Sequence, residues 1–348
     1  MKGIKIGHKV VGDRNPCLIS LEPAATYTNL HEAMTMLRIA AREGADAIKF
    51  QTFLPGDSDR MMGNKDIMIE FGTKTGKTKE RVYDALKRRE LTKSEWTKLI
   101  RYAKKLKILF ITAPYFPETV DFLVDIGIDA IKVSKGDVNN VLLIDKIAKT
   151  KLPVILDARE KISDVEIAIK ICQKNKNNNI VIMHCPSGYP AEDSGIHLHA
   201  LQRIRKEFDY PVGFSDHSAT DVMNYAAVAL GCNMLEKTIT TNRNIKRVEH
   251  FMSLETDKIS NFISNIRSIE AAMGTDSILH KSRVEENARR SFVAKRKLSA
   301  GEKITLDVLD YKRPGNSGIS VSEGFNLLNK KINQNVAQGD FLKWEMFE

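Results

Sequence analysis

The stretch DAIKVS, residues 129–134, decides the fold that this sequence predicts. It is a short apolar run that contains a single lysine, and DAIKFQ, residues 46–51, has the same pattern. Runs of four to six apolar residues with little alternation are typical of parallel strands that are buried on both faces. Six more runs of this kind are CLISLE (17–22), ILFITA (108–113), PVILDA (153–158), IVIMHC (180–185), PVGFSD (211–216) and NMLEKT (233–238).

Amphipathic stretches separate these runs, for example NLHEAMTMLRIAAREGA (29–45) and KSEWTKLIRYAKKLK (93–107). Eight strand-then-helix units in about 280 residues predict an α/β protein of the (β/α)8, or TIM, barrel type. The alternative is an open doubly wound sheet. The first strand is not followed by the G-x-G-x-x-G pattern of dinucleotide-binding sheets, which favours the barrel.

Two segments lie outside the repeating pattern. Residues 53–92 are rich in glycine and lysine and predict a mobile excursion over one face of the barrel. Within them, GTKTGK (72–77) does not fit the phosphate-binding loop spacing and predicts a solvated loop. After Gly274 the sequence becomes polar and then rich in short strands and turns. The predicted organisation is therefore a barrel domain at 1–275, a linker at 276–289 and a small β-rich domain at 290–348.

The chain is basic. Its 54 lysines and arginines exceed its 44 acidic residues and give a net charge of +10, which favours acidic partners such as nucleic acid, anionic lipid or a phosphorylated metabolite. The basic residues are scattered and aromatic residues make up 7 %, so we expect no nucleic-acid binding.

No apolar segment approaches the length of a membrane span, and the first 16 residues contain no apolar core of signal-peptide length. The four cysteines form no C-x-x-C pair and predict buried, reduced thiols. We therefore expect a cytoplasmic protein that does not bind a membrane.

Nearly every predicted strand ends in a polar or ionisable residue. In a (β/α)8 barrel the carboxyl ends of the strands meet at one mouth, where the chemistry takes place. The sequence therefore predicts one ring of functional groups, contributed by Glu22, Lys49, Gln51, Thr112, Lys132, Asp157, His184, Ser215, Asp216, His217, Glu236 and Lys237.

Lys49 and Lys132 occupy equivalent places in the two matching runs. Burying an unpaired lysine costs several kcal/mol, so each is either held in a structural ion pair or presented to an anion, and the repetition favours an anionic ligand. His217 is either a ligand or a turn-stabilising residue. His184 is better explained as a supporting or core residue, and Cys185 as a buried thiol rather than a metal ligand.

The sequence resembles the sialic acid (nonulosonate) synthase family, in which a (β/α)8 barrel precedes a C-terminal antifreeze-like (SAF) domain. The resemblance covers nearly the whole chain in the right order. It rests on IKFQTF (48–53), IKVSKGDVNN (131–140), MHCPSGYPA (183–191), GFSDHS (213–218), LEKTIT (235–240), VEHFMSLE (248–255) and YKRPGNSGI (311–319).

The resemblance implies that phosphoenolpyruvate condenses with the aldehyde of an N-acylated mannosamine-type sugar to give a nonulosonic acid and phosphate. It also implies a divalent metal, Mn²⁺ or Mg²⁺, that polarises the aldehyde, and a domain-swapped homodimer. The family's roles map onto Glu22, Asp137 and His217 as catalytic residues, and onto Lys49, Lys132, Tyr189, Ser215 and Ser187 as phosphoenolpyruvate ligands. Sugar contacts map onto Asp137, Glu249 and Arg313, with Arg313 reaching the acyl group from the small domain of a partner subunit.

Several positions depart from the family. His217 matches one metal-binding histidine, but Thr238 stands at the second, so Glu236, His184 or His250 would have to substitute. Pro23, Ala24, Thr26 and Tyr27 replace a glycine and an N-x-H element, Ala113 replaces a threonine and Ser187 an asparagine. Lys135 replaces a serine, and LDARE (156–160) brings Asp157 and Arg159 to the mouth. Lys135 and Arg159 are either new anion ligands or residues that close the site.

Three functions agree with these residues. The first is a divergent synthase that uses phosphoenolpyruvate and an unusual sugar aldehyde. The second is a metal-free lyase or aldolase in which Lys132 or Lys49 forms a Schiff base. The third is a sugar-binding or scaffolding protein that has lost catalysis, which Thr238 and Ala113 favour and the two retained lysines oppose.

Overall fold

The computed structural model describes residues 3–158, 161–275 and 283–347. The chain divides into two compact units, Met1–Gly274 and Thr275–Glu348, and each is described by itself. The predicted linker at 276–289 lies partly outside the described residues, and helix α11 (Arg283–Ala288) occupies most of the remainder. Among the described residues, no helix combines the length and apolarity needed to cross a membrane.

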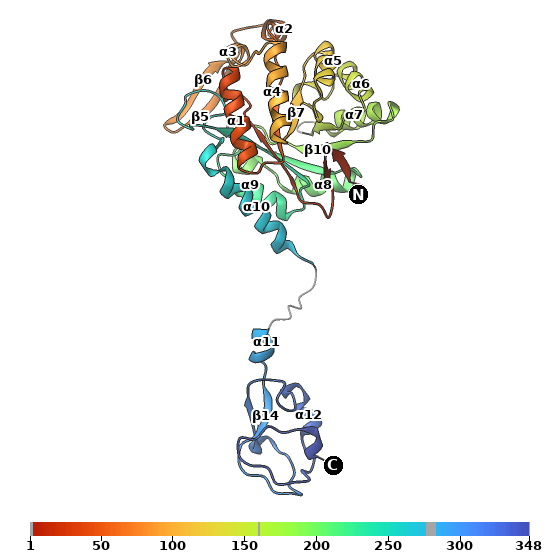
Figure 1. The fold of residues 1–348 in the computed structure, drawn as a ribbon, viewed down its shortest axis with the longest axis vertical. Helices are drawn as coiled ribbons and strands as arrows, with labels where there is room; N and C mark the ends of the chain where they lie inside the picture. Colours follow the sequence, from red (N-terminus) through yellow and green to blue (C-terminus); the bar gives the residue numbers. More distant parts are fainter. Residues whose placement is uncertain (1–2, 159–160, 276–282, 348) are drawn as a thin grey trace. The chain divides into compact units, whose positions relative to one another are not determined.

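The first unit is a closed barrel of eight parallel strands (Figure 1). Strand β12 pairs in parallel with both β11 and β3, which closes the sheet. The (β/α)8 prediction is therefore confirmed, and the open doubly wound sheet is wrong. The strands are β3 (Leu18–Glu22), β4 (Ala47–Gln51), β7 (Leu109–Ala113), β8 (Ala130–Val133), β9 (Val154–Asp157), β10 (Ile180–His184), β11 (Val212–Asp216) and β12 (Met234–Thr240).

Each helix that follows a barrel strand buries an apolar face, as its amphipathic sequence requires. In the first, the Asn29 side chain caps the amino end by accepting a hydrogen bond from the Glu32 backbone amide. Thr92 and Glu95 form a capping box at the start of α4. The helices are α1 (Leu30–Arg42), α4 (Lys93–Leu106), α5 (Pro117–Ile126), α6 (Val141–Lys149), α7 (Ile162–Lys174), α8 (His199–Glu207), α9 (Val222–Ala229) and α10 (Ile259–Met273).

The amino-terminal end of the barrel is closed by apolar side chains. The hairpin of β1 (Ile4–Ile6) and β2 (Lys9–Val11) contributes Ile4, Ile6 and Val11 to the cluster that fills this end. The same cluster contains residues from the starts of the strands, such as Leu18 and Ala47. Since this end is packed and apolar, the polar residues at the opposite strand ends line the open mouth.

The insertion between β4 and β7 is more ordered than the sequence predicts. It forms α2 (Asp57–Met61), an antiparallel hairpin of β5 (Met68–Thr73) and β6 (Gly76–Arg81), and α3 (Val82–Lys87). Residues 72–77 form the ends of both strands and the turn between them, and 74–77 are exposed, so the segment is solvated as predicted but is a hairpin turn and not an irregular loop. The Gly72 amide donates to the Tyr189 carbonyl over 2.6 Å, which attaches the hairpin to the loop after β10.

A short strand and several 3-10 turns complete the loops of the first unit. Strand β13 (Leu254–Glu255) extends the pairing of β12. The turns are η1 (Lys135–Asp137), η2 (Asp193–Gly195) and η3 (Thr256–Lys258).

The second unit is small and built around a two-stranded antiparallel sheet of β14 (Ser291–Ala294) and β15 (Leu309–Lys312). Isolated bridges such as Val293 to Phe341 hold its other segments together. Its own apolar core includes Phe292, Ile304 and Leu342. Its remaining elements are η4 (Leu306–Val308), η5 (Val321–Glu323), α12 (Gly324–Leu327) and η6 (Trp344–Met346).

Candidate active site

A cavity of about 270 Å³ opens at the carboxyl ends of the barrel strands. Lys49 of β4 and Lys132 of β8 both line this cavity, so both side chains face the barrel interior. Alternate residues of a strand point to the same side, so their immediate neighbours in the strands face outward. Strand residues on the cavity wall include Glu22, Lys49, Gln51, Lys132, Asp157 and Glu236, and His217 follows β11. The prediction that strand ends gather ionisable groups at one mouth therefore holds for these residues.

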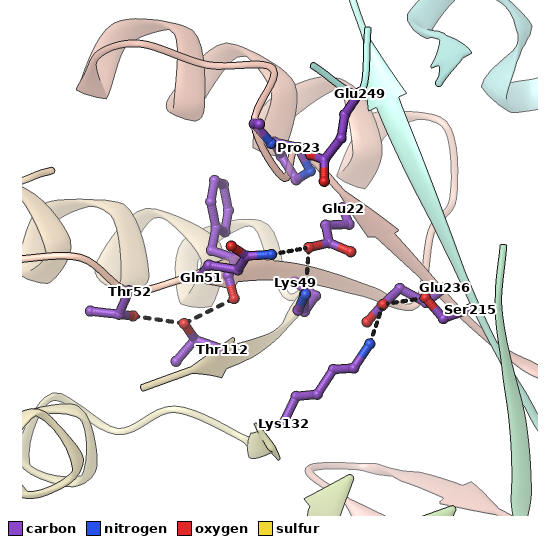
Figure 2. A network of polar contacts seen from close by, with 12 residues as sticks. Glu22, Pro23, Lys49, Gln51, Thr52, Thr112, Lys132, Ser215, Glu236 and Glu249 are labelled. Carbon is purple, nitrogen blue, oxygen red and sulfur yellow. Dashed lines mark hydrogen bonds and ion pairs between the residues drawn. The ribbon is translucent and has the colours of Figure 1, made fainter. Parts of the chain in front are cut away.

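Two buried ion pairs form the floor of this cavity (Figure 2). Lys49 pairs with Glu22 of the neighbouring strand, and Lys132 pairs with Glu236 from across the barrel. All four side chains are at most 4 % exposed. Ser215 donates to Glu236 Oε1 over 2.7 Å. Both lysines are therefore held by carboxylates, and any anion at this floor would compete with or join these pairs.

The pairs also determine which groups are charged. Burial, together with the nearby Glu236 and Glu249 carboxylates, outweighs the opposing charges of Lys49 and Lys132 and raises the pKa of Glu22 to about 7. Burial alone would raise the pKa of Glu236, but Lys132 and Lys49 outweigh it and lower the pKa below its ordinary value. For Lys132, burial lowers the pKa, but the Glu236 charge outweighs it and the net shift is upward. A protonated Lys132 is a poor nucleophile, which argues against a Schiff base at this residue.

The last two residues of β11 and the residue that follows it lie in two different environments. Ser215 and His217 face the interior, whereas Asp216 between them accepts a hydrogen bond from Lys237 Nζ over 2.5 Å. Lys237 also donates to the carbonyls of Ser218 and Thr220. This pair is outside the cavity wall and holds the turn in place. Asp216 and Lys237, which the sequence placed in the ring, are therefore structural.

His217 and Tyr189 meet at the cavity wall. Their ring centroids are 5.7 Å apart and their planes are nearly perpendicular, at 84°. The carbonyl of His217 accepts a hydrogen bond from the Ala191 amide, which ties the loop after β10 to the loop after β11. The structure thus brings His217, which the resemblance assigns to catalysis and metal binding, into contact with Tyr189, which it assigns to phosphoenolpyruvate.

The donors around His217 do not form a metal site. Thr238, at the second family position, is buried with its hydroxyl unbonded among the described residues, as is Glu236 Oε2. A threonine hydroxyl is a weak metal ligand, and Glu236 Oε1 is already bound to Lys132 and Ser215. Within the described ranges, no cluster of three His, Cys, Asp or Glu residues has a metal-binding arrangement.

The two histidines expected as substitute ligands are engaged elsewhere. His184 Nε2 lies 2.6 Å from the Ile196 carbonyl oxygen. His250 Nδ1 lies 2.8 Å from Thr240 Oγ1, and burial lowers the pKa of this imidazole to about 4. Neither histidine lines the cavity.

Of the three residues expected to bind the sugar, only Glu249 lines the cavity. Glu249 lines the cavity and its Oε2 accepts from the Ala25 amide over 2.5 Å. Asp137 lies beside the cavity in η1, where burial raises its pKa and Asn140 donates to it. Ser187, which was expected to bind phosphoenolpyruvate and not the sugar, lines a separate groove beside β5 and is absent from the cavity wall. Arg313 belongs to the second unit.

Three further residues line the cavity, and only Lys135 among them was singled out from the sequence. Arg89, two residues after the end of α3, donates to Gln51 Oε1 over 2.9 Å and to the Ala85 carbonyl over 2.8 Å. Tyr115 stacks on Phe53, and burial raises the pKa of its hydroxyl to about 12. Lys135, expected as an anion ligand or a closing residue, also lines the wall. Arg159 lies outside the described residues.

Nothing marks Arg89 in the sequence, because it lies in a segment that reads as a loop. Tyr115 follows β7 by two residues, so extending the strand-end ring by two positions would have found it.

Comparison with known proteins gives two family matches, to the NeuB family at residues 36–277 and to the SAF domain at 289–348. An N,N'-diacetyllegionaminic acid synthase of Campylobacter jejuni is 32 % identical and covers 90 % of this chain and 95 % of its own. Human N-acetylneuraminate-9-phosphate synthase is 30 % identical, with 97 % and 94 % covered. An uncharacterised protein of Methanocaldococcus jannaschii is 31 % identical, with 99 % and 98 % covered.

Among solved structures, the N-acetylneuraminic acid synthetase of Leptospira borgpetersenii superposes with a TM-score of 0.71 at 26 % identity, covering 82 % of this chain and 94 % of that one. The family model spans most of the barrel, and the relatives match over nearly their whole length. The closed barrel and the SAF domain agree with these matches, and the chain belongs to the NeuB family.

Proposed function

We propose that this chain is a nonulosonate synthase, which condenses phosphoenolpyruvate with the aldehyde of an N-acylated mannosamine-type sugar and releases phosphate. The observation that carries the proposal is the pair of buried lysines on the cavity floor. Phosphoenolpyruvate has a phosphate and a carboxylate, and Lys49 and Lys132 supply two cations within one cavity of suitable size. The names of the relatives support the same kind of reaction.

The proposed reaction begins with a carbon–carbon bond. The electron pair of the C2–C3 double bond of phosphoenolpyruvate attacks the aldehyde carbon, and the aldehyde oxygen takes up one proton. Water adds to the electron-poor C2 and loses one proton. The C2–O bond to the phosphate then breaks while the remaining C2 hydroxyl gives its proton to the departing phosphate, so hydrogen phosphate leaves and C2 becomes the carbonyl of a 2-keto acid.

The cavity residues have separate tasks in this scheme. Lys49 and Lys132 hold the anionic groups and stabilise the negative charge that the leaving phosphate carries. Glu22 is the proton donor to the aldehyde oxygen, because its carboxyl keeps a protonated fraction near neutral pH. The imidazole of His217, on the cavity wall, accepts the proton that the attacking water releases. Ser215 orients Glu236, which in turn fixes Lys132.

A divalent metal is expected from the family, but the donors around His217 among the described residues do not fit one, and no step of the scheme depends on it. Glu249 and Asp137 are proposed to contact the sugar from beside the cavity. Arg313 is proposed to reach the acyl group from the SAF domain of a partner subunit in a swapped homodimer.

The test is a coupled assay with a matched pair of lysine variants. Wild-type protein is incubated with phosphoenolpyruvate and N-acylated mannosamines, phosphate release is recorded, and mass spectrometry identifies the 2-keto acid. Lys132→Met is expected to abolish phosphate release, whereas Lys105→Met, which removes an exposed lysine of α4, leaves it unchanged.

Calorimetric titration of phosphoenolpyruvate separates the alternatives. Binding that requires Lys132 agrees with the proposal. Sugar binding without any phosphoenolpyruvate binding would overturn it and favour a binding protein that has lost catalysis.

A further inference from the structure

Arg89 is a buried cation on the cavity wall, and the residue is 5 % exposed. Its Nε donates to the Ala85 carbonyl over 2.8 Å, and its Nη1 donates to Gln51 Oε1 over 2.9 Å. The guanidinium carbon lies 4.8 Å from the centre of the Phe53 ring. These contacts hold the guanidinium in place. Among the described residues, Gln51 is the one side chain that accepts a hydrogen bond from it.

The Arg89 guanidinium determines which end of the Gln51 amide faces Glu22. An arginine side chain has donors and no acceptor, so the Gln51 atom that it contacts has to be the oxygen Oε1. The amide nitrogen Nε2 is then directed to the other side, where it lies 3.4 Å from Glu22 Oε1. The two ends of an amide are nearly equal in size, so the group can turn over with little change in packing. The guanidinium is what holds it in one orientation.

Two donors meet at one oxygen of Glu22. Gln51 Nε2 and Lys49 Nζ both donate to Oε1. Figure 2 shows both dashed lines ending on this one oxygen of the carboxyl group, whereas the other oxygen carries none. A proton on Oε1 would point at the hydrogens of these donors, so protonated Glu22 carries its proton on Oε2. Since Glu22 lines the cavity, Oε2 is the oxygen that can give this proton to a substrate.

The same two donors favour transfer of the proton. As the carbon–carbon bond forms, the aldehyde oxygen takes up the proton, the Oε2–H bond breaks and Glu22 becomes a carboxylate. Lys49 and Gln51 Nε2 stabilise the negative charge that appears, because they already point at Oε1 and need no reorganisation. If the Gln51 amide were turned over, its oxygen would face Glu22 and accept a hydrogen bond from a proton on Oε1. The acid proton would then be directed away from the substrate.

We propose, on the basis of the synthase function above, that Arg89 is a positioning residue, which holds the Gln51 amide in the orientation that places the acid proton of Glu22 on Oε2. Arg89 follows α3 and belongs to the insertion between β4 and β7. The insertion therefore takes part in the proton transfer, in addition to forming part of the cavity wall. Arg89 acts through Gln51 and does not contact the reacting atoms.

A double-variant cycle tests whether Arg89 acts through Gln51. Phosphate release gives kcat and KM for phosphoenolpyruvate, with the N-acylated mannosamine on which the wild type is most active. Arg89→Met is expected to lower kcat by about 10- to 100-fold and to keep KM within about threefold of the wild type. Gln51→Met is expected to lower kcat by a similar factor. The double variant is expected to lose no more than Gln51→Met alone, because the path from Arg89 to Glu22 is already broken.

Two further variants separate positioning from folding. Arg88→Met is the matched control, since Arg88 is the neighbouring residue, donates to Glu80 over 2.8 and 3.0 Å and is outside the cavity wall. It is expected to keep the kcat and the KM of the wild type. Arg89→Lys is expected to have a kcat about tenfold above that of Arg89→Met, because a lysine can still donate to Gln51 Oε1. The melting temperature of each variant shows whether it is folded.

The outcomes separate the two proposals. If the wild type releases phosphate but the losses of the two single variants multiply in the double variant, this inference is overturned and the synthase function stands. An equal loss of kcat in Arg88→Met also overturns it, because loosening of the segment would then explain both effects. If the wild type releases no phosphate with any acceptor, the synthase function fails and this inference fails with it. Should Arg89→Met not fold, Arg89→Lys in the wild-type and Gln51→Met backgrounds completes the same cycle.

Discussion

Replacing Lys132 by methionine is expected to destabilise the barrel by about 3–5 kcal/mol, because it leaves the Glu236 carboxylate buried without its cation. The Lys132 side chain is 4 % exposed and that of Glu236 is 2 % exposed, so water cannot take over the role of the lysine. Glu236→Leu, which leaves the lysine unpaired, is expected to cost a similar amount for the same reason.

The double variant Lys132→Met, Glu236→Leu is the informative one. It removes both charges and keeps side chains of similar size, so it is expected to recover most of the loss. Ser215 loses its acceptor in this variant, which costs about 1 kcal/mol. The cycle therefore predicts strong non-additivity, with the double variant more stable than either single one.

Tryptophan fluorescence during guanidinium unfolding measures these changes. The chain has two tryptophans, of which Trp96 is fully buried in the barrel and Trp344 lies in the second unit. A Trp344→Phe background makes the signal report the barrel alone, so that unfolding of the second unit does not enter the fit. Lys105→Met, at an exposed position, is expected to change the stability by less than about 0.5 kcal/mol.

Additive losses in the double variant would refute the argument, because additivity means that the two side chains do not depend on each other. So would a Lys132→Met protein as stable as the Lys105→Met control. Either result would mean that the floor of the cavity is not a buried ion pair, and the charge assignment for the active site would have to be revised.

Three further predictions follow from other parts of the molecule. Thr238→His restores an imidazole beside the first histidine position and is expected to tighten Mn²⁺ binding by at least about tenfold, measured by calorimetry; unchanged affinity would contradict the donor argument. His250 is neutral in the folded barrel because burial lowers its pKa from 6.5 to about 4, so the free energy of unfolding is expected to fall as the pH drops through this window, by on the order of 3 kcal/mol. Unfolding curves at several pH values should lose this slope in His250→Asn and retain it in His8→Gln, whose histidine is exposed. Gly72→Ala places a methyl group 2.7 Å from Pro190 Cδ and is expected to cost about 1–3 kcal/mol; an unchanged melting temperature would argue against the close contact of the hairpin with this loop.

The sequence determined the barrel and part of its active site. Buried parallel strands have a local signature, a short apolar run, and eight of them separated by amphipathic stretches leave few arrangements open. The positions of Lys49 and Lys132 followed from the same runs, because an ionisable residue inside an apolar strand is conspicuous. Their location at one mouth followed from the geometry that parallel barrels share.

Tertiary structure alone decided which of these groups meet. Lys132 and Glu236 are 104 positions apart and come from strands that are not neighbours, and their contact depends on barrel closure. The folding of β5, β6 and α3 over the mouth depends on packing against the loops after β3, β10 and β12, which brings Arg89 and the apolar side chains of Ala85 and Val248 to the cavity. Local patterns record burial and periodicity, whereas these contacts depend on distances across the folded barrel, which no short stretch of sequence contains.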